Sequence, residues 1–346
     1  MNLSLINNFY IIRHKNMMTQ IWEKHIHDRL NDLENFLLEK YKKEHPEKEI
    51  DYATYEKEFR QRFRNAMHEL PLLVKAATSG LRLYRGKGDK SSLPLQDRLR
   101  LILICQLAGK SNRMMAYMTQ LFAAITGIDR SYKTIERLYS DREVEIALCN
   151  LWGLMLEKKN VGNIDCCGDA TGYGLFISKH YASYAQKLKD GAKESETTKK
   201  AFAYKFALMD LKTKMYVCFG TSLISEKQAF EKAMQMLKET GVKISSIRLD
   251  RYYSFPCYVG LFPEAKVYII PRKNTTMGHG MHWCETMKSF VEETMSYLEE
   301  YFKRQNSECG WSVDKKMFGS SIRQKREDRI NTALFCRAIW HNLLRL

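Results

Sequence analysis

The sequence has few of the features that define membrane, secreted or fibrous proteins. No apolar run reaches the roughly 18 residues needed to cross a bilayer, and runs such as residues 101–105 and 121–125 are short. Only 6 prolines and 18 glycines occur in 346 residues, which excludes a fibrous or low-complexity chain. The 9 cysteines are odd in number and never form a C-x-x-C pair, so we expect reduced thiols and a cytoplasmic protein.

Positive charge is what the sequence has in excess. The 56 Lys and Arg residues outnumber the 40 Asp and Glu residues, which gives a net charge of +16 and a pI near 9.3. Such a basic chain is typical of proteins with a polyanionic partner. A hydrophobic fraction of 45% excludes wholesale disorder, and the length allows two or three domains.

The first half of the chain is predicted to be helical. Residues 17–77 place apolar side chains, such as Ile26, Leu30, Leu33 and Leu37, at helical spacing. Residues 84–94 crowd Gly, Ser, Pro and charge together without periodicity, which predicts a linker. Residues 95–159 again have a helical pattern.

A helix-turn-helix pattern lies within this second helical stretch. An apolar helix ends at a turn over residues 127–130, and Ser131 is placed to cap a second helix. That helix would present Tyr132, Lys133 and Arg137 outward, toward DNA. Helical hairpins that never touch DNA have the same pattern, so both interpretations stay open.

From residue 161 the sequence becomes prone to β-structure. A helix is predicted at residues 226–240, ended by Gly241, and a longer one from about residue 285 to 309, stopped by Gly310. The order of elements resembles an RNase H-like α/β fold with a mixed sheet. The predicted strands are residues 163–169, 202–211, 215–224, 244–250 and 265–271.

The predicted domain division has three parts. Residues 1–90 form an N-terminal helical region, residues 91–160 a helix-turn-helix region for DNA binding, and residues 161–346 the RNase H-like catalytic domain.

Three carboxylates occupy positions at which such folds assemble sites. Asp169 and Asp250 follow two of the predicted strands, and Glu308 lies near the end of the last helix. Hard divalent cations prefer oxygen ligands, so three converging carboxylates suit two Mg²⁺ or Mn²⁺ ions. Asp165 precedes Asp169 by four residues and would point to the same side of a regular strand, so it is an alternative first ligand.

The spacing Tyr301-x2-Arg304-x3-Glu308-x6-Lys315 is the most specific pattern in the chain. Here the sequence resembles the DDE-type insertion-sequence transposases of bacteria and archaea that carry the tyrosine-arginine-glutamate-lysine (YREK) signature. Residues 163–174, 247–254 and 270–274 are also similar to segments of that family, so the likeness covers about the last half of the chain.

The resemblance implies a DNA transposase that cleaves transposon ends in a metal-dependent reaction and transfers the strands into target DNA. It implies double-stranded DNA as the partner, a homodimer on DNA, and neither a membrane nor a nucleotide cofactor. It assigns metal binding and catalysis to Asp169, Asp250 and Glu308. It assigns contact with the DNA backbone at the cleavage point to Tyr301, Arg304 and Lys315. The alternatives are a non-transposing RNase H-fold nuclease or resolvase, and a catalytically silent DNA-binding protein.

Two further motifs do not predict a ligand site. Residues 80–87 have five residues between their glycines and no Ser or Thr after Lys87, so they are not a phosphate-binding loop of the P-loop type. His279, His282 and Cys284 lack the second ligand pair of a zinc finger, so we expect a loop there.

Overall fold

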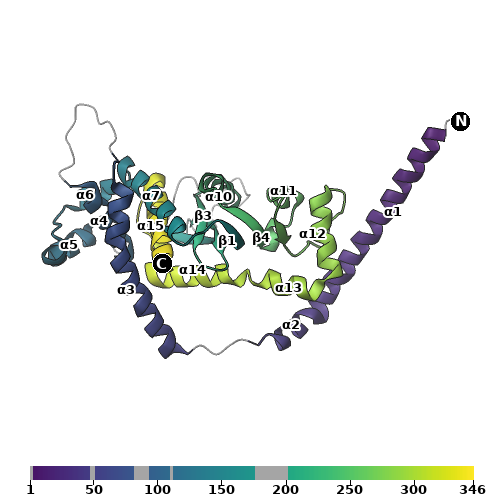
Figure 1. The fold of residues 1–346 in the computed structure, drawn as a ribbon, viewed down its shortest axis with the longest axis horizontal. Coiled ribbons are helices and arrows are strands. Elements are labelled where there is room, and N and C mark those ends of the chain that lie inside the picture. The colour runs from purple at the N-terminus through teal and green to yellow at the C-terminus, as the bar shows by residue number, and fades with distance from the viewer. Residues whose placement is uncertain (1–2, 47–50, 82–92, 110–111, 176–201) are drawn as a thin grey trace, which may run out of the picture. The chain divides into compact units, whose positions relative to one another are not determined.

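The computed structural model describes residues 3–46, 51–81, 93–109, 112–175 and 202–346 (Figure 1). The chain divides into two compact units, each drawn from three stretches of sequence. The first unit comprises Met1–Asp51, Asn163–Asp169 and Lys243–Asn306, and the second comprises Tyr52–Gly162, Ala170–Val242 and Ser307–Leu346. The linker predicted at residues 84–94 lies outside the described residues up to residue 92.

The first unit combines helices from its N-terminal and C-terminal stretches. Helix α1 (Leu3–Asp32) continues through the π-helical turn η1 (Leu33–Leu37) into α2 (Leu38–Glu44), and α1 contacts α12 (Met281–Glu292). An ion pair also joins the N-terminal and C-terminal stretches of this unit, because the Lys273 ammonium lies 3.1 Å from the Glu34 carboxylate of η1. The remaining helical elements of this unit are η2 (Arg251–Tyr253), α11 (Pro256–Val259) and α13 (Thr294–Phe302).

Parallel strands form the sheet of the first unit. The beginning of β1 (Asn163–Leu175) pairs with β4 (Lys243–Leu249), which pairs with β5 (Lys266–Tyr268). Helix α13 packs on β4 and β5, where the Tyr297 hydroxyl accepts the N–H of Ile269 at 2.8 Å. This contact fixes α13 against the ends of the parallel strands.

The second unit contains most of the helices. Helix α15 (Glu327–Leu343) lies at its centre. It packs against α4 (Leu95–Ala108), α7 (Arg142–Lys158) and β3 (Tyr216–Ser222). The buried indole of Trp340 on α15 donates to the Leu103 carbonyl at 2.8 Å, so its polar end is satisfied inside the core. The helices of this unit are α3 (Tyr52–Thr78), α4 (Leu95–Ala108), α5 (Asn112–Thr126), α6 (Tyr132–Leu138), α7 (Arg142–Lys158), α10 (Glu226–Thr240), α14 (Gln305–Phe318) and α15 (Glu327–Leu343).

Strands β2 (Phe202–Asp210) and β3 (Tyr216–Ser222) form an antiparallel hairpin under α10. The Ser225 hydroxyl caps α10 by accepting the N–H of Gln228, and Gly241 ends it with φ of 68°. Gly220 lets the helix approach, since a Cβ there would lie 2.0 Å from the Ala229 carbonyl oxygen. The predicted helix at residues 226–240 and its glycine stop are confirmed.

The strands form a mixed sheet of order β3-β2-β1-β4-β5, with the short β6 (Ser321–Ile322) also parallel to β1. The five strands predicted from the sequence are all present, and the combination with helices confirms the α/β class. Among the residues that the structure describes, no helix has the length and apolar character that a bilayer crossing requires.

Candidate active site

Two of the predicted metal-binding carboxylates lie at matching positions of neighbouring parallel strands in the first unit, Asp169 within β1 and Asp250 directly after β4. The register of β1 and β4 pairs Gly168 with Leu249, so Asp169 and Asp250 are the next residues on the two strands. Adjacent strands lie about 5 Å apart, which places the two half-buried aspartates side by side. Asp250 also accepts the N–H of Arg251 at 2.6 Å, which caps the turn after β4.

Strand β1 does not end at Asp169 as predicted, but continues to Leu175. Its last residues, Gly174 and Leu175, pair with Ser321 and Ile322 of β6. These partners are distant in the sequence, so no local pattern reveals the extension. Asp169 therefore lies within a strand, whereas Asp250 ends one.

Arg304 faces the first of these aspartates, Asp169. Its guanidinium nitrogen lies 4.0 Å from the Asp169 carboxylate, and both side chains are less than one-fifth exposed. The same guanidinium lies 5.7 Å from the centre of the Tyr301 ring, which is itself buried. A cation held over an aromatic face beside a carboxylate is suited to receive a phosphate group.

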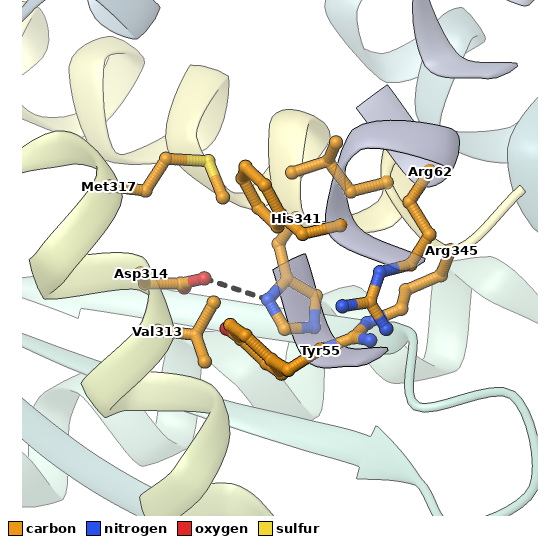
Figure 2. A pocket seen from close by; sticks show the side chains of 9 residues that line it. Tyr55, Arg62, Val313, Asp314, Met317, His341 and Arg345 are labelled. Carbon is orange, nitrogen blue, oxygen red and sulfur yellow. Dashed lines mark hydrogen bonds and ion pairs between the residues drawn. The ribbon is translucent and has the colours of Figure 1, made fainter. Parts of the chain in front are cut away.

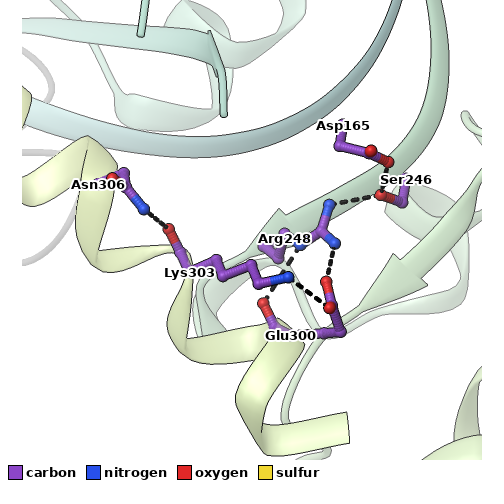
Figure 3. A network of polar contacts seen from close by, with 6 residues as sticks. All are labelled: Asp165, Ser246, Arg248, Glu300, Lys303 and Asn306. Atoms are coloured by element: carbon purple, nitrogen blue, oxygen red, sulfur yellow. Dashed lines mark hydrogen bonds and ion pairs between the residues drawn. The ribbon is translucent and has the colours of Figure 1, made fainter. Parts of the chain in front are cut away.

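Asp165, the alternative first ligand, has different partners. Its carboxylate accepts the hydroxyl of Ser246 on the neighbouring strand β4 (Figure 3). Ser246 in turn accepts a hydrogen bond from Arg248 at 2.5 Å. Asp165 thus belongs to a network along β4, while Asp169 faces Arg304.

Arg248 is the centre of this network and was missed by sequence reasoning. Its side chain is 3% exposed and pairs with the Glu300 carboxylate, while its Nε donates to the Glu300 carbonyl at 3.2 Å (Figure 3). Lys303 also pairs with Glu300 at 2.5 Å. Burial alone would raise the pKa of Glu300, but the hydrogen bonds from Lys303 and Arg248 outweigh it and lower that pKa.

This network attaches α13, which carries Tyr301 and ends just before Arg304, to β4, which Asp250 follows. The available signal was a basic residue between Ile247 and Leu249 in a buried strand, because a buried charge requires a partner. The partner, Glu300, is 52 residues away, so the sequence pattern could not identify it.

The predicted single helix from about residue 285 to 309 is wrong. Three successive helices occupy the region, with breaks at Glu293 and at residues 303–304, and Gly310 lies inside α14 instead of ending it. A Cβ at Gly310 would lie 2.4 Å from Met209 Cε and 3.1 Å from the Tyr216 hydroxyl. Glycine is present here because the helix packs closely on the hairpin, not because the helix stops.

Glu308 and Lys315 lie on α14, in the second unit. They are seven residues apart, two helical turns, and therefore share one face. Glu308 is exposed, and the half-buried Lys315 places its ammonium 5.6 Å from the centre of the Tyr173 ring. The structure thus joins Lys315 to the helix of Glu308, which the sequence left undecided.

The described part of the chain contains no group of three or more His, Cys, Asp or Glu side chains arranged to hold a metal ion. Within the first unit, the structure places Asp169 beside Asp250 on the neighbouring strand and beside Arg304. Two carboxylates on adjacent strands match the one or two that Mg²⁺ takes from a protein, with water and phosphate oxygens completing its coordination.

The helix-turn-helix has the predicted elements. Gly127, with φ of 67°, follows α5, and the Ser131 hydroxyl accepts the N–H of Thr134 at the start of α6. The three side chains predicted to face outward are exposed, and they are Tyr132, Lys133 and Arg137.

The arginines at the start of α15 are paired with acidic side chains. Arg329 pairs with Glu136 of α6 and donates to the Ser140 hydroxyl at 2.9 Å. Arg326 pairs with Asp328 at 2.7 Å. Arg329 therefore links α15 to α6, whereas the pair of Arg326 is local to the start of α15.

Comparison with known proteins bears directly on this arrangement. No protein-family model matches the chain. The chain is 40% identical over 329 residues to a probable transposase for insertion sequence element ISA1214 from Archaeoglobus fulgidus. The match covers 95% of this chain and 98% of the relative. The chain belongs to the insertion-sequence transposases. Because nearly all of the transposase is matched, the relationship extends to both units.

Proposed function

We propose that this transposase is of the DDE type, cleaving DNA at the ends of its element and joining the cut ends to target DNA. The observation that carries the proposal is the placement of Asp169 and Asp250 side by side on parallel strands, with Arg304 4.0 Å from Asp169. Carboxylates at this position of an α/β sheet are typical of active sites.

Asp169, Asp250 and Glu308 are the residues that would hold two Mg²⁺ or Mn²⁺ ions. When bound, such ions activate the attacking oxygen and stabilise the leaving oxygen at phosphorus. The pair Asp169 and Asp250 fits such an ion, because carboxylate oxygens are the ligands these cations prefer. Asp169 is favoured over Asp165 because Asp165 is engaged by Ser246, whereas Asp169 lies 4.0 Å from Arg304.

The reaction has two steps at phosphorus. In the first, a water oxygen bonds to phosphorus at the element end and the DNA 3′-oxygen leaves as a hydroxyl. In the second, this 3′-hydroxyl bonds to a target phosphate and displaces a target 3′-oxygen.

The basic residues of the signature would position the scissile phosphate. Arg304 can donate two parallel hydrogen bonds to phosphate oxygens, and Lys315 supplies a second positive charge on the face of Glu308. The buried Tyr301 ring supports the guanidinium of Arg304, and its contact with DNA at the cleavage point stays a prediction.

The second unit would recognise double-stranded DNA. Tyr132, Lys133 and Arg137 are exposed on α6, and the chain carries a net charge of +16. These features support contact of the helix-turn-helix with the element ends. A homodimer on DNA would bring two such ends together.

The test is a cleavage and joining assay on DNA that carries the element ends, with Mg²⁺ or Mn²⁺. Asp169→Asn, Asp250→Asn and Glu308→Gln should each retain DNA binding and reduce both steps by about 10³-fold or more. Asp165→Asn, on the same strand, is the matched control and should keep activity within about tenfold of wild type.

Three results would contradict parts of the proposal. Cleavage without joined products would indicate a nuclease or resolvase. Binding without any cleavage, in all variants and the wild type, would indicate a DNA-binding protein. Loss of activity in Asp165→Asn but not in Asp169→Asn would reassign the first ligand.

A further inference from the structure

A small pocket in the second unit lies between helix α3 and the end of helix α15 (Figure 2). Tyr55 and Arg62 line it from α3, and His341 and Arg345 line it from α15 and the residues just after it. It lies outside the group of residues assigned above to DNA cleavage.

Two arginines converge on this pocket. Figure 2 shows the guanidinium groups of Arg62 and Arg345 turned toward each other. Burial, followed by the positive charge of Arg62, lowers the pKa of Arg345. The buried Nε of Arg345 has no hydrogen-bond partner within the described chain. A bound anion would reduce the repulsion between the two cations and could accept the unsatisfied hydrogen bond.

The acidic groups nearby offset these positive charges only in part: the charge of Asp314 raises the pKa of Arg345, but burial and Arg62 outweigh it. Asp314 accepts a hydrogen bond from the His341 ring at 2.7 Å (Figure 2). It also accepts the Tyr216 hydroxyl at 3.0 Å, so both of its oxygens are engaged. Glu58 lies 4.0 Å from Arg62 and is mostly exposed, where water weakens the attraction.

We propose that Arg62 and Arg345 form a binding site for a phosphate group. Guanidinium groups present paired donors that match phosphate oxygens, and the Tyr55 ring, 5.9 Å from the Arg62 guanidinium, holds one of them in place. The phosphate belongs either to the DNA backbone, which rests on the function proposed above, or to free phosphate.

The first arm of the test uses inorganic phosphate and does not depend on transposase activity. Thermal unfolding of the full chain is compared in phosphate and in chloride at equal ionic strength, for wild type, Arg62→Gln, Arg345→Gln and the double variant. Phosphate should raise the wild-type midpoint above its chloride value, and this gain should vanish in each variant. In chloride, Arg345→Gln should melt at or above wild type, because it removes a charge repelled by Arg62.

The second arm measures how DNA affinity depends on salt. If a DNA phosphate fills the pocket, the slope of log affinity against log salt should fall by about 0.9 in each single variant. The double variant should fall by the same amount, since both arginines hold one phosphate. Arg60→Gln is the matched control, because Arg60 is exposed on α3 and does not line the pocket. Any change that it makes in the salt slope should simply add to the change made by Arg345→Gln.

The two arms separate the sources. Phosphate stabilisation together with a changed salt slope identifies the DNA backbone, whereas stabilisation with an unchanged slope identifies free phosphate. Equal effects of phosphate on wild type and variants, with unchanged salt slopes, would overturn the site.

Discussion

Each unit buries a basic side chain that comes from a strand, but the two buried charges have different surroundings. Arg248 in the first unit is 3% exposed and hydrogen-bonded to Ser246 and Glu300. Lys205 in the second unit is fully buried, and its ammonium has no hydrogen-bond partner among the described residues. It instead faces the rings of Trp311, Tyr216 and Phe219, 5.0 to 5.7 Å away.

The difference shows which buried charge organises a site. Arg248 reaches across to α13, so its pairing fixes the position of the helix before Arg304. Lys205 is surrounded by aromatic faces, which compensate only partly for the lost hydration of its charge. One cation therefore positions a candidate site, and the other lies in the core at a net cost in stability.

The largest expected effect comes from breaking the paired cation. Arg248→Met leaves the Glu300 carboxylate without its buried partner and should lower the free energy of unfolding by about 3 kcal/mol. Lys303→Met removes the exposed partner of the same carboxylate and should change the free energy of unfolding by less than about 0.5 kcal/mol. Urea denaturation of both variants measures the contrast, and equal effects would show that Arg248 has no special role.

Replacing the unpaired cation should have the opposite sign. Burial lowers the pKa of Lys205 to about 8, against the opposing charge of Asp314. Lys205→Met should therefore raise the free energy of unfolding at pH 7, by about 2–3 kcal/mol. A destabilised Lys205→Met would mean that the aromatic rings stabilise the ammonium fully.

The same variant has a defined pH dependence. Between pH 8 and about 10.5 the unfolded state binds more protons at Lys205 than the folded state, so this residue makes wild-type stability rise with pH. The advantage of Lys205→Met should shrink across that window. Denaturation of both proteins at several pH values measures the difference, in which the other titrating groups cancel.

The smallest effect concerns the packing near the aromatic rings that face Lys205. Gly310→Ala pushes a methyl group toward Met209 and the Tyr216 hydroxyl, which Asp314 holds, and should cost about 1–2 kcal/mol. Gly153→Ala, in the exposed middle of α7 with open space around it, should stabilise by about 0.5–1 kcal/mol. If both alanines stabilise, α14 is not held closely against the hairpin.

The sequence predicted those elements whose signals are local. Alternating and continuous apolar runs located the strands, and Ser131, Gly127 and Gly241 marked helix ends correctly. Gly310 was misread because a glycine required by close packing has the same appearance as a helix stop. The predicted division into residues 1–90, 91–160 and 161–346 stays a prediction.

The candidate site was predictable only where its residues have a local sequence signal. Asp169 and Asp250 follow strand patterns, so their juxtaposition on parallel strands could be anticipated. The continuation of β1 beside β6 and the pairing of Arg248 with Glu300 depend on residues far apart in the chain. Such contacts are set by tertiary packing and leave no periodic pattern.

The most direct test of the central claim, that Asp169 and Asp250 hold a catalytic metal ion, is metal rescue of cysteine variants. A thiolate is a poor ligand for Mg²⁺ and a better one for softer cations. DNA cleavage by Asp169→Cys and Asp250→Cys should be lost in Mg²⁺ and partly restored in Mn²⁺, while Asp165→Cys cleaves in both. Rescue of Asp165→Cys alone, or full Mg²⁺ activity in all three variants, would contradict the account.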